Sequence, residues 1–536
     1  MRKMSPIYLS LVLVVVATVA ASGQSFQVQC PTSTITHPSA LHDNNSEPAY
    51  SGPTSLTTLA PAAGGYQVPS ANVNGAIKCQ QISGGDGFAT MGDGSQTYLF
   101  AFGPLSGLAD MSKGLPGTQF PNVFNTVAPP LVPGDPATSD GASQTPYSFG
   151  DPSLFSYNGA VGLAPDVDAI AAGSCTAPCL DGHVDPRPIM DVGVMNGNIP
   201  APLMAIDEDD EFFLTLTNVG QVMRPDLFEQ HTVHFHGYPN ASAFYDGVPD
   251  ASVAINIGGS FTYYYLAPDA GTYFWHCHIT PPEHLQMGMV GQLYVRPRQN
   301  RVPSNTSLLA ALQAQQLDPR TKCDSTDILC SNPLPKVDTG AMGGAKYAYN
   351  DGDGTTRYDV EYPLQIHGFD PNFHFVGMTF NPEGFTEMKD KYFLLNGRSY
   401  PDTIHNGPLA TQTTDGSLHY AQPMSAIINI PYGGKALLRI ADLDVTEYQT
   451  LASLGIPMQV IALNAKLLRD QAGNNLYYNT NSITLAGGES LDVILDASDT
   501  SKYPSGSVFY LYTPNLDHLS NDAENFGGLM TEVRIN

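Results

Sequence analysis

Hydrophobic and polar residues alternate over short stretches in the last two thirds of the chain. Residues 212–218 read Phe-Phe-Leu-Thr-Leu-Thr-Asn, and further short apolar runs follow at 251–257, 262–266, 272–275 and 291–295. After residue 358 the pattern resumes, and strands are predicted there at 392–395, 426–430, 435–440, 458–463, 490–495 and 508–512. Short strands separated by turn residues are typical of a sandwich or barrel. We therefore predict an all-β fold.

Regions without this alternation divide the predicted strands into units. Residues 24–95 are rich in Ser, Thr, Ala, Gly, Pro and Asn, which predicts a loop-rich leader. A strand at 97–102 precedes an insertion at about 103–188, and the linker at 299–356 contains one predicted helix, Ser307–Gln316. We expect a signal peptide at 1–23, a leader at 24–95, a first β domain at 96–298 and a second at 357–536.

The N-terminus has the residue order of a secretory signal. Arg2 and Lys3 precede an apolar run at 7–16, and small residues follow at 17–23. We expect cleavage between about Ala20 and Gln24, and the alternative is an uncleaved membrane anchor. Later apolar segments are too short to cross a bilayer, so we predict a secreted or periplasmic protein without a membrane span after processing.

Size and charge narrow the possible partners. A chain of 536 residues suits two or three domains of the usual ~150 residues each. Its 50 acidic and 23 basic residues give a net charge of -27, which repels polyanions and excludes nucleic acid as a partner. The acidic run 207–211 is interpreted as a solvated turn before a strand, with attraction of cationic substrates as the alternative.

The chain contains seven cysteines, and an exported protein meets an oxidising compartment. Short spacings favour the disulfides Cys175–Cys179 and Cys323–Cys330, which leave Cys30 to pair with Cys79, although six cysteines allow 15 pairings. The pair at 175 and 179 could instead bind metal, but no second pair of ligands lies nearby in the sequence. Cys277 is the remaining thiol.

The two β regions contain a diverged repeat. Residues 196–202 are echoed by 396–401, and the motif His-Thr-Val-His-Phe-His-Gly at 231–237 aligns with Gln-Thr-Leu-Ala-Ser-Leu-Gly at 449–455. Residues 274–278 align with 511–515. The histidines of the first copy have no counterpart in the second copy of this alignment, so we expect the second domain to keep the scaffold and lack the ligands.

Six of the 14 histidines lie between residues 231 and 284. Residues two apart on a strand face the same side, so His234 and His236 point together, as do His276 and His278, while Cys277 points the opposite way. A thiolate with two imidazoles and a thioether is the ligand set of a blue, type 1 copper centre. The sequence therefore predicts two copper sites on opposite faces of one strand.

Two motifs in this region resemble the copper-binding motifs of the multicopper oxidase family, which is related to laccases and copper nitrite reductases. They read HxxHxHG at 231–237 and HCH at 276–278 followed by HxxxGM at 284–289. The resemblance implies two tandem cupredoxin-like Greek-key domains, the first of which binds copper. It implies that the type 1 copper ligands are His231, Cys277, His284 and Met289. It also implies that the type 2 and type 3 copper ligands, which form the catalytic site, are His234 for type 2 and His236, His276 and His278 for type 3. Met287 is the alternative axial ligand, which we expect to pack in the core.

The resemblance further implies a copper-dependent oxidoreductase. Electrons from a small-molecule or metal-ion donor would enter at the type 1 copper and pass through His276 or His278 to the histidine-rich site, which would reduce dioxygen. One alternative is a nitrite-reductase-like enzyme, but His234 stands where a typical nitrite reductase has Asp, which favours the oxidase. The other alternative is a blue-copper electron-transfer protein without enzymatic activity.

A complete trinuclear copper site in this family takes its histidines from four HxH pairs, and this chain has two. Three completions are open at this point. Histidines of the second domain such as His367, His374 or His518 could be supplied across an oligomer interface, the site could hold a single copper, or two first domains could pair about a two-fold axis. The resemblance implies a homo-oligomer, which in related two-domain proteins is a trimer.

Overall fold

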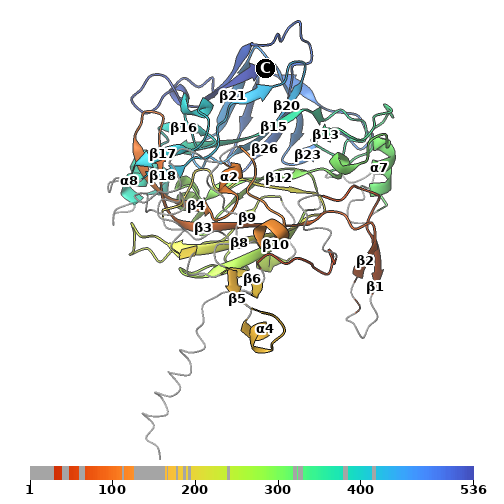
Figure 1. The fold of residues 1–536 in the computed structure, drawn as a ribbon. Helices are drawn as coiled ribbons and strands as arrows, with labels where there is room; N and C mark the ends of the chain where they lie inside the picture. The colour runs from red at the N-terminus through yellow and green to blue at the C-terminus, as the bar shows by residue number, and fades with distance from the viewer. Residues whose placement is uncertain are drawn as a thin grey trace, which may run out of the picture.

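The computed structural model describes most of the chain after residue 28. The described residues are 29–38, 47–58, 65, 67–111, 114–125, 163–165, 167–176, 179–184, 189–190, 195–237, 242–267, 269–317, 323, 330–377, 384–412 and 418–536. Figure 1 shows two β-rich units, the second of which carries the C-terminus. No helix among the described residues is long and apolar enough to span a membrane. The predicted all-β fold is confirmed, while the predicted signal peptide and its cleavage site lie outside the described residues.

The first β unit, residues 77–296, is built from two sheets packed face to face. Its strands are β3 (Ile77–Thr90), β4 (Gln96–Pro104), β7 (Met204–Asp207), β8 (Glu211–Gly220), β9 (His234–Phe235), β10 (Ser260–Leu266), β11 (Gly271–His276) and β12 (Val290–Arg296). One sheet has the order β10-β8-β3-β4 and the other β7-β12-β11-β9. Apolar side chains from both sheets fill the space between them, and Trp275 of β11 stacks on Phe102 of β4 with ring centroids 5.3 Å apart.

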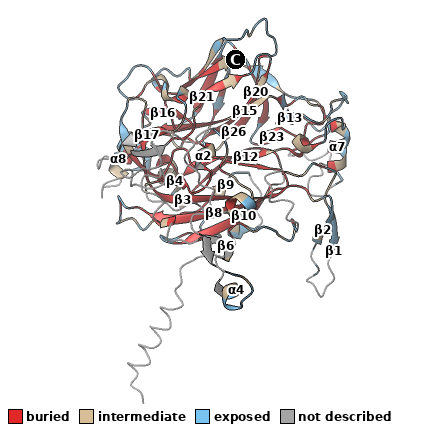
Figure 2. Cartoon of the chain, in the orientation of Figure 1, coloured by how far each residue is buried: buried red, intermediate tan, exposed pale blue. Residues whose placement is uncertain are grey.

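The second β unit, residues 360–535, repeats this construction. Its strands are β15 (Val360–Phe369), β16 (Tyr392–Leu395), β19 (Ile428–Ile430), β20 (Lys435–Asp442), β21 (Gln449–Leu454), β22 (Met458–Leu463), β23 (Lys466–Leu467), β24 (Tyr478–Thr480), β25 (Ser482–Leu485), β26 (Ser490–Asp496), β27 (Val508–Tyr512) and β28 (Met530–Ile535). One sheet has the order β16-β15-β20-β26-β22-β23, with β24 also pairing with β22, and the other has β19-β28-β27-β21-β25. Figure 2 shows that the strands of both units are largely buried.

Strand order supports the repeat inferred from the sequence. The order β10-β8-β3-β4 matches β26-β20-β15-β16, and β7-β12-β11-β9 matches β19-β28-β27-β21. The parallel pairs also correspond, because β3 runs parallel to β8 as β15 does to β20, and β7 runs parallel to β12 as β19 does to β28. The two units therefore share one topology.

Strand register corrects one predicted alignment by a single residue. His276 lies opposite His234, and Tyr512 lies opposite Ala452, which was aligned with His234. The Cys277 amide donates to the carbonyl of Met289 at 3.0 Å, and in the second unit the Thr513 amide donates to Leu529 at 2.9 Å. Thr513 is therefore the counterpart of Cys277, and residues 273–277 align with 509–513. The alignment of 231–237 with 449–455 agrees with the register.

The predicted leader is wrong where it includes β3. This strand pairs with β8 on one side and β4 on the other, so it is an inner strand of the first unit. The expected start of the first domain at residue 96 is therefore too late. The interpretation of 251–257 as a strand is also wrong, because it forms only a bridge between Ile255 and His231.

Shorter elements surround the two units. The helices are α2 (Leu108–Met111), α3 (Pro121–Phe124), α4 (Val167–Ala171), α6 (Pro281–Gln286), α7 (Leu308–Gln315) and α8 (Pro371–Gly377). The 3-10 turns are η4 (Ala243–Tyr245), η5 (Arg298–Arg301), η6 (Phe385–Glu387), η7 (Asp402–Ile404) and η8 (Asp517–Leu519). The remaining strands form the pairs β1 (Ser55–Thr58) with β2 (Gln67–Ala71), β5 (Leu163–Pro165) with β6 (Leu180–Val184), β13 (Lys346–Tyr347) with β14 (Arg357–Tyr358), and β17 (Leu409–Gln412) with β18 (Leu418–Ala421). Helix α7 agrees with the helix predicted in the linker, and the Ser307 side chain caps it by accepting from Ala310 N.

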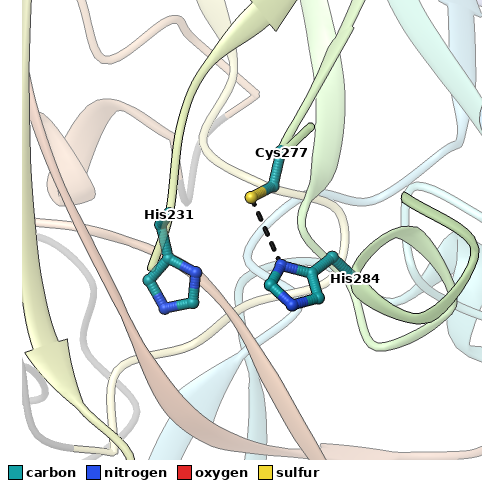
Figure 3. A group of neighbouring side chains, drawn as sticks. All are labelled: His231, Cys277 and His284. Carbon is teal, nitrogen blue, oxygen red and sulfur yellow. Dashed lines mark hydrogen bonds between the residues drawn. The ribbon is translucent and has the colours of Figure 1, made fainter. Parts of the chain in front are cut away.

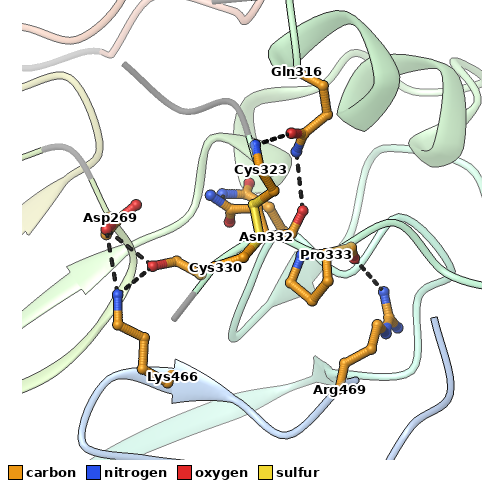
Figure 4. Close-up of a disulfide and its surroundings, with 10 residues drawn as sticks. Asp269, Gln316, Cys323, Cys330, Asn332, Pro333, Lys466 and Arg469 are labelled. Atoms are coloured by element: carbon orange, nitrogen blue, oxygen red, sulfur yellow. Dashed lines mark hydrogen bonds and ion pairs between the residues drawn. A yellow bond between two sulfur atoms is a disulfide. The ribbon is translucent and has the colours of Figure 1, made fainter. Parts of the chain in front are cut away.

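The three predicted disulfides are present, and Cys277 is the free cysteine. Figure 4 shows the Cys323–Cys330 bridge in the linker. Near it, Lys466 of the second unit lies 3.7 Å from Asp269 of the first. Arg469 donates to the carbonyl of Pro333 at 3.2 Å. The linker therefore contacts the second unit close to where the two units meet.

The acidic run 207–211 is buried, which contradicts its interpretation as a solvated turn. Lys78 Nζ lies 2.9 Å from Asp207 and 3.1 Å from Asp210, and 2.8 Å from Glu47. Arg298 forms two hydrogen bonds to Asp209. These carboxylates surround cations of the chain itself, because buried charges need a partner of opposite sign. The run ties the residues before β3 and the linker to the first unit.

Strands β11 and β12 form part of the contact between the two units. Thr272 donates to Asp492 at 2.6 Å, and Gln292 of the neighbouring strand donates to the carbonyl of Arg439 at 2.8 Å. Phe274 packs in a small apolar cluster with Leu443, which follows β20. The face of β11 that bears His276 thus borders the second unit.

Candidate metal centre

The backbone around β9, β11 and α6 brings the predicted ligands together. His234 and His276 are opposite each other on neighbouring antiparallel strands. Cys277 follows directly after β11, so its side chain leaves on the face opposite to that of His276. His231 is held by paired backbone hydrogen bonds to Ile255. His284 comes from α6, which two prolines begin, as suits the first turn of a helix.

The first group consists of His231, Cys277 and His284, shown in Figure 3. One ligand atom from each lies within 4.8 Å of those of the other two, and all three side chains are fully buried. Nδ1 of His284 is 3.3 Å from Sγ of Cys277, and the amide of Thr232 donates to the same sulfur at 3.4 Å. The group has the thiol and two imidazoles of a type 1 copper site.

Burial and mutual attraction set the protonation of this group. Burial opposes ionisation of Cys277, but the neighbouring imidazoles of His284 and His231 outweigh it and hold the pKa of the thiol well below its usual value. Burial also opposes a charge on His284, yet Cys277 and Glu229 raise its pKa to about 9. Burial lowers the pKa of His231. A thiolate is therefore favoured, which is the form that binds metal.

The polar atoms of the first group fit a metal ion. Apart from the adjacent Cys277 sulfur, the buried ring nitrogens of His231 have no hydrogen-bond partner in the described structure. Buried polar atoms are normally hydrogen-bonded, and an absent ion is one cause of an exception. The soft sulfur and the two imidazoles match copper better than a hard cation such as magnesium. The residues present therefore fit copper.

Met289 and Met287 are both fully buried in the core cluster that contains Cys277. The Met289 backbone is hydrogen-bonded to Cys277. A Cβ atom added to Gly377 of α8 would be 3.5 Å from Met287 Cε, so the Met287 side chain reaches toward the second unit. This position agrees with the expectation that Met287 packs in the core. Axial ligation of copper by Met289 stays a prediction.

The second group lies on the other face of β11. One ring nitrogen each of His234, His236 and His276 falls within 4.8 Å of the others. The ring of the fourth predicted ligand, His278, is centred 5.1 Å from that of His234 and 5.4 Å from that of His276. The structure thus gathers the four imidazoles that the motif predicted for the second site.

Hydrogen bonds orient these imidazoles. His234 Nδ1 donates to the carbonyl of Asp246 at 2.7 Å, and His276 Nδ1 donates to the carbonyl of Cys277 at 2.6 Å. A carbonyl partner fixes the proton on Nδ1 and leaves Nε2 as the electron-pair donor. Burial lowers the pKa of His276 to about 3, and burial together with His234 lowers that of His236 to about 4. Neutral imidazoles suit metal binding.

The scattered histidines of the second unit do not join either group. His367 and His374 are buried against the first unit of the same chain, where they contact the carbonyls of Leu285 and Gln286. His518 is buried within the second unit beside Gln449. Within this chain, these positions give no support to the hypothesis that such histidines complete the second site across an oligomer interface.

Three neighbours of the ligands were missed by sequence reasoning. Glu229 Oε2 lies 3.7 Å from Nε2 of His284, and its position two residues before the first motif is the signal that could have suggested it. A Cβ on Gly488 would be 3.0 Å from His236 Nδ1, so the second unit reaches the second group. A Cβ on Gly84 would be 2.7 Å from the His231 ring. No sequence signal marks either glycine.

The second unit has a remnant of the first group at equivalent positions. Gln449 stands in place of His231, Thr513 in place of Cys277, and Leu529 in place of Met289. The Leu529 amide donates to the carbonyl of His518 as the Met289 amide donates to that of His284, so His518 is the counterpart of His284. His518 Nδ1 is 3.1 Å from Gln449 Oε1, and its Nε2 is 3.3 Å from Glu447. One histidine with its carboxylate neighbour is therefore kept without the thiol.

Comparison with known proteins finds a match for the region that holds both groups. Residues 182–300 match the sequence profile of the family described as Multicopper oxidase. Laccase abr2 of Aspergillus fumigatus is 34% identical over 109 residues, which are 20% of this chain and 17% of that protein. A copper-containing nitrite reductase of Rhizobium meliloti is 34% identical over 109 residues, which are 19% of this chain and 26% of that protein. The resemblance to multicopper oxidases is confirmed for this region.

The match is limited in extent. The matched region spans about a sixth to a quarter of the length of these two relatives. The solved structure of a blue copper oxidase from Nitrosomonas europaea is similar with a TM-score of 0.42 and 22% sequence identity, over 63% of this chain and 78% of that one.

Proposed function

We propose that this protein is a copper-dependent oxidoreductase of the multicopper oxidase type. The observation that carries the proposal is the pair of ligand groups on opposite faces of one strand. A buried thiol with two imidazoles lies on one face and four imidazoles lie on the other, and Cys277 adjoins His276 and His278 in the chain. The family match over 182–300 supports the same reading.

In this proposal the first group holds type 1 copper through His231, Cys277 and His284, with Met289 as axial ligand. His234 would be a type 2 ligand, and His236, His276 and His278 would be type 3 ligands. The bound copper ions would supply one-electron uptake at the first group and reduction of dioxygen at the second. The peptide bonds on either side of Cys277 provide a short covalent path between the groups.

The Nε2 edge of His284 is the favoured place for the electron donor. Glu229 lies against this edge and its side chain is 28% exposed, so the carboxylate connects the buried group with the surface. A donor that contacts this edge avoids transfer through the core. Both a small organic molecule and a metal ion fit this proposal, and dioxygen is the proposed acceptor.

A nitrite-reductase-like enzyme is the second candidate. One structural observation favours it: the described second group offers four imidazoles where a full cluster needs more. A one-copper site needs fewer ligands and would serve nitrite as acceptor. A relative described as a copper-containing nitrite reductase matches the same region. A blue-copper carrier without an enzymatic site is the remaining alternative.

A homo-oligomer, with a trimer as the first expectation, belongs to the same proposal. It would supply the further ligands that the described residues of one chain do not bring to the second group. Contact of Gly488 with His236 disfavours direct two-fold pairing of two first units, because the second unit occupies part of that face. We propose that the protein acts outside the cytoplasm, as the predicted signal and the disulfides suggest.

The test is acceptor consumption by the copper-loaded, full-length protein. With a phenol or ferrous ion as the electron donor, we expect dioxygen uptake in proportion to the amount of donor oxidised. We expect no turnover of nitrite. Nitrite consumption without dioxygen uptake would identify the second candidate. Reduction and reoxidation of a blue chromophore without turnover of either acceptor would identify an electron carrier.

A further inference from the structure

Residues 284–289, called here the ligand loop, comprise the end of α6 and the turn that follows it. They are held by the second unit, which supplies none of the proposed copper ligands. Two histidines of the second unit reach backbone carbonyls that directly follow His284. His367 Nε2 lies 3.0 Å from the carbonyl oxygen of Leu285, and His374 Nε2 lies 2.9 Å from that of Gln286. Both imidazoles are buried, with exposures of 1% and 0%. These contacts are therefore shielded from competing water.

The side chain of Gln286 is fixed by the same unit. Its Nε2 donates to Asp390 at 3.0 Å, and its Oε1 accepts from the Asp370 amide at 3.0 Å. Gln286 is itself completely buried. Residues 285 and 286 thus have side-chain and backbone contacts to three segments of the second unit, which leaves this part of the ligand loop little freedom to shift.

His374 also connects the ligand loop to the first unit. Its Nδ1 lies 2.6 Å from the carbonyl of Tyr98 on β4, on the opposite side of the ring from Gln286. The ring stacks on Phe369 with centroids 3.7 Å apart. Burial lowers the pKa of His374 to about 3, so the ring is neutral and donates to one of the two carbonyls at a time. Stacking on Phe369 and the hydrogen bond to the accepting carbonyl fix its orientation.

Within the ligand loop, hydrogen bonds pass this constraint to the ligands. The Gly288 amide donates to the carbonyl of Leu285 at 3.0 Å, and the Met289 amide donates to that of His284 at 2.8 Å. A shift of Leu285 or Gln286 would therefore move His284 and Met289 together. Groups outside the ligand shell orient ligands and tune a bound metal in this way.

We infer that His367 and His374 are positioning residues that hold the ligand loop so that His284 and Met289 face Cys277. The inference rests on the proposed function, since it concerns the geometry of the proposed type 1 site. It also gives the second unit a role, because a unit without copper ligands of its own would set the geometry of the copper site in the first.

The test substitutes each histidine in the full-length protein. His374→Phe and His367→Phe keep an aromatic ring and remove the donor, whereas His374→Gln and His367→Gln keep an amide nitrogen near the place of Nε2. His374→Asn is too short to reach Gln286. His518→Phe is the matched control, because His518 is also buried and stacks on Phe393 at 3.7 Å but lies within the second unit, beside Gln449.

Copper(II) affinity, measured against a competing chelator, and the parallel hyperfine splitting of the type 1 EPR signal are the first readouts. We expect the Phe variants to lose about tenfold or more in affinity and to change the splitting, with recovery in the Gln variants. His518→Phe should match the unaltered protein. If the Phe variants do not fold, His374→Asn compared with His374→Gln decides. The inference would be overturned if the Phe variants had the same copper affinity and hyperfine splitting as the unaltered protein. It would also be overturned if His374→Asn and His374→Gln did not differ in these two quantities.

Hydrogen exchange of residues 284–289 in the metal-free protein separates this inference from the proposed function. Faster exchange of this segment in His374→Phe or His367→Phe, and not in His518→Phe, supports positioning even if the unaltered chain forms no type 1 centre. Equal exchange in all these variants would overturn positioning, even if a blue centre forms. Failure to form a blue centre in the unaltered chain counts against the proposed function alone.

Discussion

The two β units have the same strand order but differ in the chemistry at equivalent positions. The first unit places His231, Cys277, His284 and Met289 where the second has Gln449, Thr513, His518 and Leu529. Both sets lie at the same junctions of strands and loops. The fold therefore does not depend on the thiol or on a metal, and the difference isolates the residues that we propose to bind copper.

The histidine retained in the second unit shows which part of the arrangement is structural. His518 pairs with Glu447 at 3.3 Å as His284 pairs with Glu229 at 3.7 Å. A buried histidine with a neighbouring carboxylate is thus stable without a thiol beside it. The pair of His284 and Glu229 alone is weak support for a metal site, and the addition of Cys277 and His231 is what makes the first unit different.

The largest expected effect comes from removal of the thiol. In Cys277→Ser the copper-loaded protein should lose the intense visible absorption and the type 1 EPR signal completely, because the thiolate is the ligand responsible for both. Thr513→Ser, the equivalent change in the second unit, should leave them unaltered. Persistence of the blue band in Cys277→Ser would contradict the assignment.

Removal of one imidazole from the second group should distinguish the roles of the two sites. In His276→Phe we expect donor oxidation to fall by about 100-fold or more, because metal-assisted catalysis contributes several kcal/mol and each 1.4 kcal/mol is about tenfold. The blue signal should remain. Tyr512→Phe changes the equivalent position of the second unit and should retain full activity. Steady-state oxygen uptake checks both, and undiminished turnover in His276→Phe would refute the role of this group.

Restoration of the ligands should give the second unit a centre of its own. The triple variant Gln449→His, Thr513→Cys, Leu529→Met keeps His518 and rebuilds the ligand set of the first unit. We expect about twofold more blue absorption per chain and one more bound copper. Copper analysis with visible spectra measures this. If the triple variant folds and its absorption is unchanged, these ligands at equivalent positions are not sufficient to form a type 1 centre.

The smallest expected effect concerns the edge of His284. Glu229→Gln should lower the second-order rate constant for oxidation of ferrous ion by about threefold to tenfold, because a partly exposed ionic contact is worth about 1 kcal/mol. Glu447→Gln should leave the rate constant unchanged. Stopped-flow reduction of the blue chromophore distinguishes the two variants, and equal rates would place donor entry elsewhere.

Much of the site was predictable because its ligands are close in sequence and lie on strands. Alternation along β11 was enough to place Cys277 and His276 on opposite faces, and the motif spacing brought in His231 and His284. That these residues bind copper stays a prediction. Contacts from distant segments were not predictable, and His367, His374 and Gly488 reach the site only because the second unit packs against the first.

The errors of sequence reasoning have physical causes. Strand β3 was interpreted as loop because it contains glycines and polar residues, yet it is paired on both sides and Gly84 leaves room for His231. The acidic run 207–211 was interpreted as solvated because its cations, Lys78 and Arg298, lie far away in sequence. The alignment of residues 274–278 was displaced by one because Trp275 was matched to another aromatic residue, Tyr512.

The central claim is that Cys277, His231 and His284 bind type 1 copper in the first unit and that the second unit has lost this capacity. The most direct measurement is the EPR spectrum of the copper-loaded protein, recorded with a copper count. We predict one type 1 signal per chain with narrow parallel hyperfine splitting, which Cys277→Ser abolishes. Bound copper that gives only broad splitting, equal in Cys277→Ser and the unaltered chain, would contradict the account.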